Sequence, residues 1–138
     1  MEGKPVILHP LRVGLMGQNE DEIIAGVLHD VVEDTEITIS YLEEQGVSDK
    51  VLKALELLTH NEEETYREYI ERLAKSNNML AMRVKLNDLT HNIERGKQYG
   101  HQSLVKRHES AYEYLVSAMN TEKVKLFENQ DVGANFGR

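Results

Sequence analysis

The apolar residues of the chain recur with the period of an α-helix along nearly its whole length, and no segment alternates convincingly as a strand would. Residues that cap helix starts divide this pattern, such as Asn19 with Glu22 in the capping-box position. We therefore expect an all-α fold. The predicted helices cover residues 10–16 and about 20–34, two short segments after Thr38 and Ser48 with Gly46 between them, residues 63–75, a long segment from Asn77 to near Gly96, and residues 103 to about 126.

Composition narrows the class of protein. The chain has 138 residues, a length that fits one domain with one hydrophobic core. Its net charge of −8, from 16 basic and 24 acidic residues, argues against a nucleic-acid polymer or an anionic membrane surface as the partner. The absence of cysteine excludes disulfides, cysteine-ligated zinc, iron–sulfur clusters and thiol nucleophiles. No apolar run is long enough to cross a membrane and no secretory signal is visible, so we expect a cytoplasmic protein.

The second predicted helix separates an apolar side from a polar side on a helical wheel. The polar side carries His29, Asp30, Glu33 and Asp34, and Gly26, one turn earlier, is expected to leave space beside them. Clustered carboxylates near a helix C-terminus repel one another and oppose the helix dipole, a conflict that a bound cation would remove. This helix alone supports a solvated acidic face and a metal site equally. The apolar side, expected to face the core, consists of Ile23, Ile24, Val27, Leu28, Val31 and Val32.

The long predicted helix carries a second polar face, on which Lys85, Asp88 and Asn92 line up at steps of three and four residues. Spacing alone favours an ordinary surface pair between Lys85 and Asp88. His9 lies in an apolar segment, where a lone histidine is usually part of the core. The apolar stripe of this helix is Met82, Leu86, Leu89 and Ile93, and the histidines without ligand spacing, expected at the surface or around a site, are His60, His91, His101 and His108.

Three segments in this order carry a resemblance to a known family: ILHPLRV, GVLHDVVEDT and VKLNDLTHNIERGK. They resemble the HD-domain metal-dependent phosphohydrolases. The HDVVEDT run is most similar to the hydrolase domain of the RelA/SpoT alarmone enzymes and to the small stand-alone alarmone hydrolases. The resemblance covers roughly residues 3–96. It implies a bundle of about six to seven helices, here a single domain over residues 1–127. Residues 128–138 are polar and include two glycines, so we expect them to form a flexible tail.

The resemblance also implies roles for individual residues. The implied reaction is removal of the 3′-pyrophosphate of (p)ppGpp by a metal-activated water. The family's Lys and Asn beside the last metal ligand correspond to Lys85 and Asn92, and the family's Asn contacts the substrate. The metal ligands correspond to His9, His29, Asp30 and Asp88, and the catalytic pair corresponds to Glu33 and Asp34.

An acidic protein that binds a polyphosphate needs local cations. Lys85, Arg83 and Arg12 are candidates, and Arg12 lies one turn after His9, although a solvated surface arginine is an equally good interpretation of Arg12. Family members usually carry an N-terminal helix and an Arg-Lys pair that packs on the guanine base. We expect this helix to be missing here, with Lys4 as the nearby cation.

The sequence departs from the family at two further places. The stretch HNEEE from His60 onward replaces a lysine that often lies close to the phosphates, and Asn87 takes the position of an alanine. These departures leave two alternatives open. One is an HD-type phosphohydrolase with a different nucleotide substrate. The other is a non-catalytic module that binds metal and nucleotide, against which Glu33 and Asp34 speak, because a binding module needs no water-activating pair.

The donor set indicates the metal. Two imidazoles and two carboxylates suit Mn, Fe, Co or Zn better than Ca or Mg, which prefer all-oxygen shells. Four protein ligands would close a tetrahedral zinc site, whereas an octahedral ion keeps two positions for a water and a phosphate oxygen. We therefore expect a divalent metal, Mn²⁺ in particular, which the resemblance also implies. The expected partner is a small phosphorylated nucleotide, and the sequence does not predict an oligomeric state.

Overall fold

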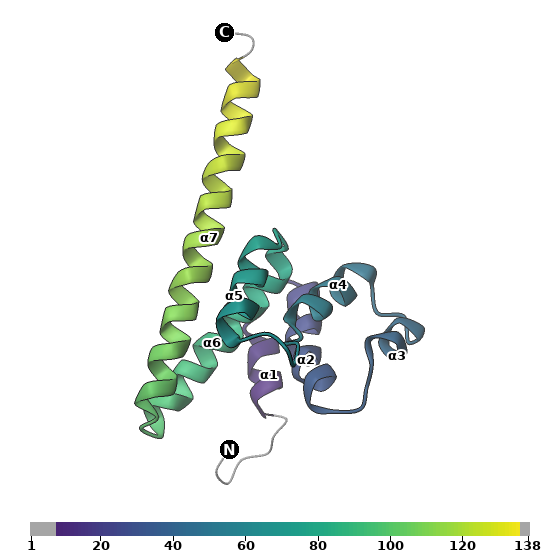
Figure 1. Ribbon diagram of the computed structural model, residues 1–138. Coiled ribbons are helices and arrows are strands. Elements are labelled where there is room, and N and C mark those ends of the chain that lie inside the picture. The colour runs from purple at the N-terminus through teal and green to yellow at the C-terminus, as the bar shows by residue number, and fades with distance from the viewer. Residues whose placement is uncertain (1–7, 136–138) are drawn as a thin grey trace.

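The computed structural model describes the backbone over residues 8–135 and the side chains over residues 9–121. Within this range the chain forms seven α-helices and no strand, so the predicted all-α class is confirmed (Figure 1). The last helix packs against α6 and α5, and its C-terminal part extends beyond the other helices (Figure 1). The helices are α1 (Leu8–Leu15), α2 (Glu20–Asp34), α3 (Ile39–Glu44), α4 (Asp49–Leu58), α5 (Tyr66–Lys75), α6 (Met79–Gln98) and α7 (Gln102–Asn135).

Side-chain caps set most helix starts. The predicted caps Asn19, Thr38 and Ser48 are confirmed, because each side chain accepts a hydrogen bond from a backbone amide of the first turn. The predicted cap Asn77 is wrong by one residue. Asn78 has the extended backbone of a cap, whereas Asn77 lies in the left-handed region with φ 57°, which asparagine tolerates better than most residues.

Further boundaries differ from the prediction. The first helix begins at Leu8 rather than at residue 10, so His9 lies in its first turn and not in an extended segment before it. The fifth helix begins at Tyr66 rather than at residue 63, because Thr65 and Glu68 form a reciprocal capping box that fixes its start. The last helix continues to Asn135 rather than ending near Leu126, so its backbone includes most of the segment predicted as a tail. The flexibility of residues 128–138 stays a prediction.

The hydrophobic core lies mainly between α4, α5, α6 and α7. Its completely buried side chains include Leu55, Leu73, Met82, Leu89 and Leu115, one or two from each of these helices. Within the described residues, no helix combines the length and the apolar character that a membrane span requires.

A close backbone contact joins α1 to α2. A Cβ atom on Gly26 would lie 3.0 Å from the Cα atom of Gly14 and 3.2 Å from the carbonyl oxygen of Val13. The prediction that Gly26 leaves space beside the polar residues is therefore wrong, since this glycine makes room for α1. The contact places the start of α1, with His9, against the polar face of α2.

The predicted apolar side of α2 is only partly the buried side. Ile24, Leu28 and Val32 pack against the core, but Ile23 is 41% exposed. The buried residues of α2 are Glu22, Ala25, Gly26 and His29, because α1 and α6 cover this face. The polar face of α2 is thus an internal surface at His29 and becomes solvent-exposed only at its last turn.

Candidate metal centre and adjoining pocket

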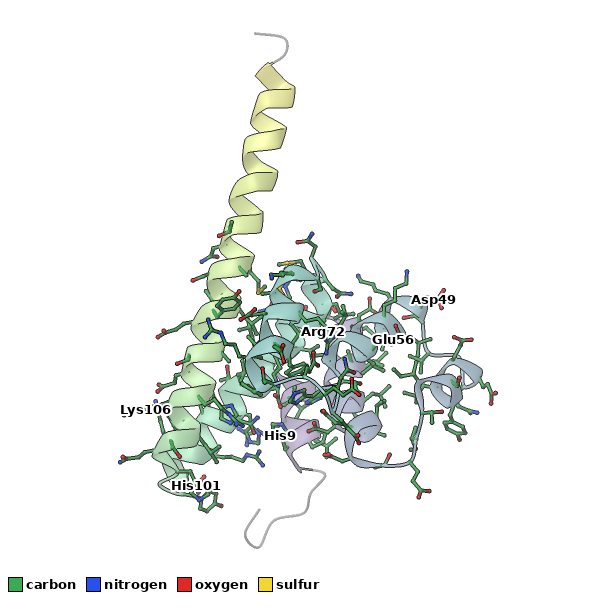
Figure 2. All side chains as sticks on the ribbon, viewed as in Figure 1. His9, Asp49, Glu56, Arg72, His101 and Lys106 are labelled. Carbon is green, nitrogen blue, oxygen red and sulfur yellow. The ribbon has the colours of Figure 1, made fainter. Side chains whose placement is uncertain are left out.

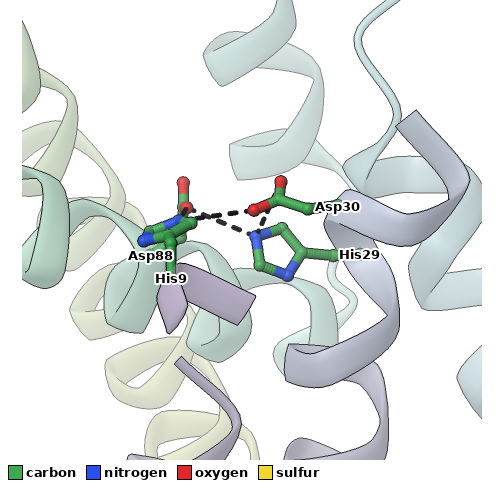
Figure 3. Close-up of side chains that lie close together, drawn as sticks. All are labelled: His9, His29, Asp30 and Asp88. Carbon is green, nitrogen blue, oxygen red and sulfur yellow. Dashed lines mark hydrogen bonds and ion pairs between the residues drawn. The ribbon is translucent and has the colours of Figure 1, made fainter. Parts of the chain in front are cut away.

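Four potential ligands converge from three helices. His9 comes from the first turn of α1, the adjacent His29 and Asp30 from α2, and Asp88 from the middle of α6 (Figure 3). One ligand atom from each residue lies within 4.8 Å of all the others. His101, by contrast, lies at the turn between α6 and α7, at the end of these helices (Figure 2).

The four side chains present their metal-binding atoms to one another. The Nε2 atom of His9 lies 2.6 Å from Oδ1 of Asp88 and 3.5 Å from Oδ2 of Asp30. The Nε2 atom of His29 lies 3.3 Å from Oδ1 of Asp88 and 3.2 Å from Oδ1 of Asp30. Because both imidazoles and one carboxylate are buried, and ligand bonds are roughly 2.0–2.6 Å, the four atoms fit around one cation.

A backbone carbonyl fixes the tautomer of His29. The Nδ1 atom of His29 donates to the carbonyl oxygen of Gly26 at 2.6 Å. A carbonyl only accepts, so Nδ1 carries the proton and the lone pair of Nε2 is left for a metal. Burial lowers the pKa of His29, but the hydrogen bond and charge of Asp88 outweigh burial and the net shift is upward.

The second imidazole is held by a third histidine. The Nδ1 atoms of His9 and His91 lie 2.6 Å apart, and the rings stack with centroids 4.8 Å apart. Burial and the nearby charge of His9 lower the pKa of His91 to about 4, so His91 is neutral at pH 7. A neutral His91 accepts the Nδ1 proton of His9, which leaves Nε2 of His9 for the metal.

Asp88 is oriented by Lys85. The ammonium Nζ donates to Oδ2 of Asp88 at 2.9 Å, which leaves Oδ1 for the histidines, and Nδ2 of Asn92 lies 3.4 Å from Oδ1. Lys85 is only 9% exposed and lies over the rings of Tyr69 and Tyr66 at 5.1 and 5.9 Å. The spacing of Lys85 and Asp88 favoured an ordinary surface ion pair, and this prediction is wrong because the pair is buried.

The charges of this cluster set the protonation of its carboxylates. Burial alone would raise the pKa of Asp88, but the charge of Lys85 and the hydrogen bonds that the histidines donate through Nε2 hold it well below its usual range. A cation bound here would take the place of these Nε2 protons. Burial raises the pKa of Asp30, and the nearby charge of Asp88 adds to this rise against the lowering effect of His29. A cation bound between the carboxylates of Asp30 and Asp88 would offset their mutual repulsion.

A pocket of about 630 Å³ opens beside the four ligands. Glu33 and Asp34 lie at its rim on the exposed last turn of α2, and Lys85 and Asn92 also line it, as the prediction of one shared site requires. Burial raises the pKa of Glu33, opposed by a hydrogen bond from the backbone amide of His60. The polar and aromatic residues around the pocket are His9, Asp30, Glu33, Asp34, Thr35, His60, Tyr66, Tyr69, Lys85, Asp88, Asn92, Arg95 and Arg107.

Two of the predicted cations, Arg83 and Arg12, do not line the pocket. Arg83 forms an ion pair with Glu22 at 3.7 Å instead. Arg12 is exposed on α1 and is not among the lining residues, although its charge contributes to the lowered pKa of His91. Lys4 lies outside the described residues.

The structure adds pocket residues that sequence reasoning missed. Arg95 follows Asp88 by two helical turns, so the helical period on α6 was a usable signal for it. Arg107 comes from α7 and Tyr66 from α5. The guanidinium carbon of Arg107 lies 4.4 Å from the ring centroid of Tyr66, a contact that only the folded chain brings about. His60 lies in the loop between α4 and α5, where no spacing marks it.

Comparison with known proteins identifies relatives. No family model matches the chain. The guanosine-3′,5′-bis(diphosphate) 3′-pyrophosphohydrolase of Aquifex aeolicus is 33% identical over 104 residues, covering 67% of this chain. A protein of Synechocystis named as a probable enzyme of the same kind is 35% identical over 105 residues, covering 66% of this chain. The chain spans 14% of the length of each. The predicted resemblance is thereby confirmed, and the chain is a relative of the HD-domain hydrolases.

Proposed function

We propose that the chain is a metal-dependent phosphohydrolase that removes the 3′-pyrophosphate of (p)ppGpp. One water is consumed, and ppGpp yields GDP and pyrophosphate. The observation that carries the proposal is the convergence of His9, His29, Asp30 and Asp88. His9, Asp30 and Asp88 also line a pocket that cationic side chains share. The names of the two relatives support this substrate. The proposal places the activity in the cytoplasm and in the stringent response.

We propose Mn²⁺ as the ion held by these four residues. Two neutral imidazole nitrogens and two carboxylate oxygens form a mixed donor set that suits it. When bound, such an ion polarises a phosphoryl oxygen and makes a water more acidic. Asp30 and Asp88 line the pocket, so the open side of the centre faces the place where a substrate would bind.

Glu33 is the proposed general base, with Asp34 as the other member of the pair. Both lie one helical turn beyond the ligands of α2 and on the pocket side. Burial raises the pKa of Glu33 toward the range in which a carboxylate accepts protons effectively near neutral pH. Glu33 takes one proton from the water as the water oxygen attacks phosphorus. The bond between phosphorus and the ribose 3′-oxygen breaks, and this oxygen leaves with the bonding electron pair and takes up a proton from solvent, which gives the 3′-hydroxyl of GDP.

The proposed phosphate contacts offset the acidity of the protein. Arg95 and Arg107 line the pocket beside Lys85 and Asn92, so positive side chains are concentrated there despite a net charge of −8. A guanidinium group can donate two parallel hydrogen bonds to a phosphate group, which favours a diphosphate over a neutral ligand. Contact of the substrate with Arg12 and Lys4 stays a prediction.

A panel of nucleotides tests the proposed substrate. The Mn²⁺-loaded chain is incubated with ppGpp, pppGpp, GTP and ATP, and the products are separated by anion-exchange chromatography. The proposal predicts that ppGpp gives GDP and pyrophosphate in equal amounts. Hydrolysis of GTP or ATP with ppGpp untouched would support the alternative of another nucleotide substrate. Binding of ppGpp without any product would support the non-catalytic module.

A further inference from the structure

The loop between α4 and α5 holds the side chain of Glu33. The Oε1 atom of Glu33 accepts a hydrogen bond from the backbone amide of His60 at 3.1 Å, across 27 residues of sequence. Glu33 lies on the exposed last turn of α2, where a glutamate otherwise has several rotamers to choose from. The amide of His60 selects one of them, so the position of this loop sets the position of the carboxylate.

Arg72 of α5 fixes that loop on both sides of His60. Its guanidinium donates to the carbonyl oxygens of Leu57 and Thr59 at 3.0 and 2.9 Å. It also donates to both carboxylate oxygens of Glu64, at 3.1 and 2.7 Å. Four bonds from one planar group tie residues before and after His60 to a single point, which a lysine at this position would not do.

The ring of His60 also packs against α5, the helix that carries Arg72. It stacks on Tyr69 with centroids 4.8 Å apart and an interplanar angle of 17°. Its Nε2 atom donates to the carbonyl oxygen of Glu64 at 2.8 Å, and the hydroxyl of Tyr69 donates to the carbonyl oxygen of Leu58 at 2.6 Å. The amide of His60 therefore belongs to a rigid loop, and Arg72 supplies most of its fixed points.

We propose that Arg72 is a positioning residue, which holds the α4–α5 loop so that the His60 amide keeps the carboxylate of Glu33 at the pocket. Arg72 lies on α5 (Figure 2). It is not among the residues that line the pocket. The inference rests on the proposed function, because it takes Glu33 as the group that activates water. It differs from a purely structural role in that its effect passes through Glu33.

Kinetics of Arg72→Gln provide the first test. We expect kcat for ppGpp to fall about tenfold with KM unchanged, since a general base contributes roughly 10²–10⁴-fold and a misplaced one retains part of this. The matched control is Arg67→Gln, which removes an exposed arginine of the same helix that pairs with Glu71 at 3.0 Å. The control is expected to keep full activity. A rise in KM without a fall in kcat would overturn the inference.

A double-mutant cycle separates positioning from general damage. In the Glu33→Gln background, Arg72→Gln is expected to lower kcat no further, because the group it positions is already lost. A second tenfold loss there would show that Arg72 acts by another route and would overturn the inference. If Arg72→Gln fails to fold, Glu64→Gln takes its place, since it removes the negative charge and replaces one of the two oxygens that accept from the guanidinium by an NH2 group.

Two measurements keep this inference distinct from the proposed function. In NMR spectra, Arg72→Gln is expected to shift the His60 amide proton upfield by more in the parent than in the Glu33→Gln background, where only the direct effect of the lost bond to the Thr59 carbonyl remains. Arg67→Gln is expected to leave this proton unchanged. Calorimetry is expected to give the same Mn²⁺ affinity for Arg72→Gln and the parent. If the parent releases no pyrophosphate, the proposed function fails, and the amide shift alone then decides whether Arg72 positions Glu33. An unchanged His60 amide in Arg72→Gln would overturn the inference in either case.

Discussion

The Nε2 atom of His9 lies 2.6 Å from the Oδ1 atom of Asp88, although 79 residues separate the two in sequence. The same carboxylate oxygen lies 3.3 Å from Nε2 of His29, so one oxygen joins α1, α2 and α6. Both histidines and Asp88 are buried. A cation at this point would therefore bind only the folded chain, and its affinity would add to the stability of the fold.

Metal binding is expected to stabilise the protein measurably. At Mn²⁺ concentrations near one hundred times the dissociation constant, the gain in unfolding free energy is about 2.7 kcal/mol, which calorimetric melting detects as a higher Tm. His29→Ala and Asp30→Ala are each expected to abolish this gain. His101→Ala, which removes an exposed histidine at the α6–α7 turn, serves as the control and keeps it. A full Mn²⁺ response in His29→Ala would exclude the proposed centre.

His91 is expected to support metal affinity through His9. His91→Phe keeps a ring for the stack but removes the acceptor of the His9 Nδ1 proton. Loss of such an outer partner typically weakens metal affinity roughly 10–100-fold. Titration of Mn²⁺ into the metal-stripped variant measures the change. An affinity equal to that of the parent would show that His9 needs no such partner.

Glu33→Gln is expected to bind Mn²⁺ as the parent does and to lose turnover. The isosteric amide keeps the packing but accepts no proton, so the rate should fall by roughly 10²–10⁴-fold. Pyrophosphate release from ppGpp measures the loss, with Asp34→Asn assayed beside it. Equal rates for Glu33→Gln and the parent would transfer the role of base to Asp34.

Gly26→Ala is expected to destabilise the fold and the centre together. The added methyl group would meet the backbone of α1 at 3.0 Å and push away the helix that carries His9. Overpacking of this kind costs about 1–3 kcal/mol of unfolding free energy. Urea denaturation with and without Mn²⁺ checks the prediction. A variant as stable as the parent, with the same metal response, would show that α1 is free to shift without consequence.

The bond between Arg72 and Glu64 predicts a dependence of stability on pH. The hydrogen bonds from Arg72 lower the pKa of Glu64 from 4.5 to about 2 in the folded chain. A lowered carboxyl pKa stabilises the fold above the unfolded value of 4.5 and loses this effect as the pH falls toward 2. The Tm of the parent should therefore exceed that of Glu64→Gln at neutral pH. This difference in Tm should decrease as the pH falls below 4.5. A gap that is constant with pH would mean that ionisation of Glu64 contributes nothing.

The elements that sequence reasoning predicted well are those set by local chemistry. The bounds of α2 follow from the Asn19 cap, and its polar face contains His29 and Asp30 because the helical period alone places them together. Tertiary packing decided the rest. The spacing of Lys85 and Asp88 showed that they pair but not that α5 buries them, and Gly26 showed a need for space but not which neighbour fills it.

Contacts between helices that are distant in sequence also could not be predicted from the sequence. His9 was a metal ligand only by resemblance, since nothing in its neighbourhood shows that α1 packs on α6. His91 was expected at the surface or around a site, and its contact with His9 depends on the same packing. The loop that carries His60 has no periodic pattern, so its bond to Glu33 was not predictable from spacing.

The most direct test of metal-dependent hydrolysis is pyrophosphate release from ppGpp by metal-stripped protein, measured before and after addition of Mn²⁺. We predict no release from the stripped protein and release of one pyrophosphate per ppGpp once Mn²⁺ is restored. The His29→Ala variant should stay inactive under both conditions. If no pyrophosphate is released from ppGpp although calorimetry shows that Mn²⁺ is bound, the proposed hydrolase activity is contradicted.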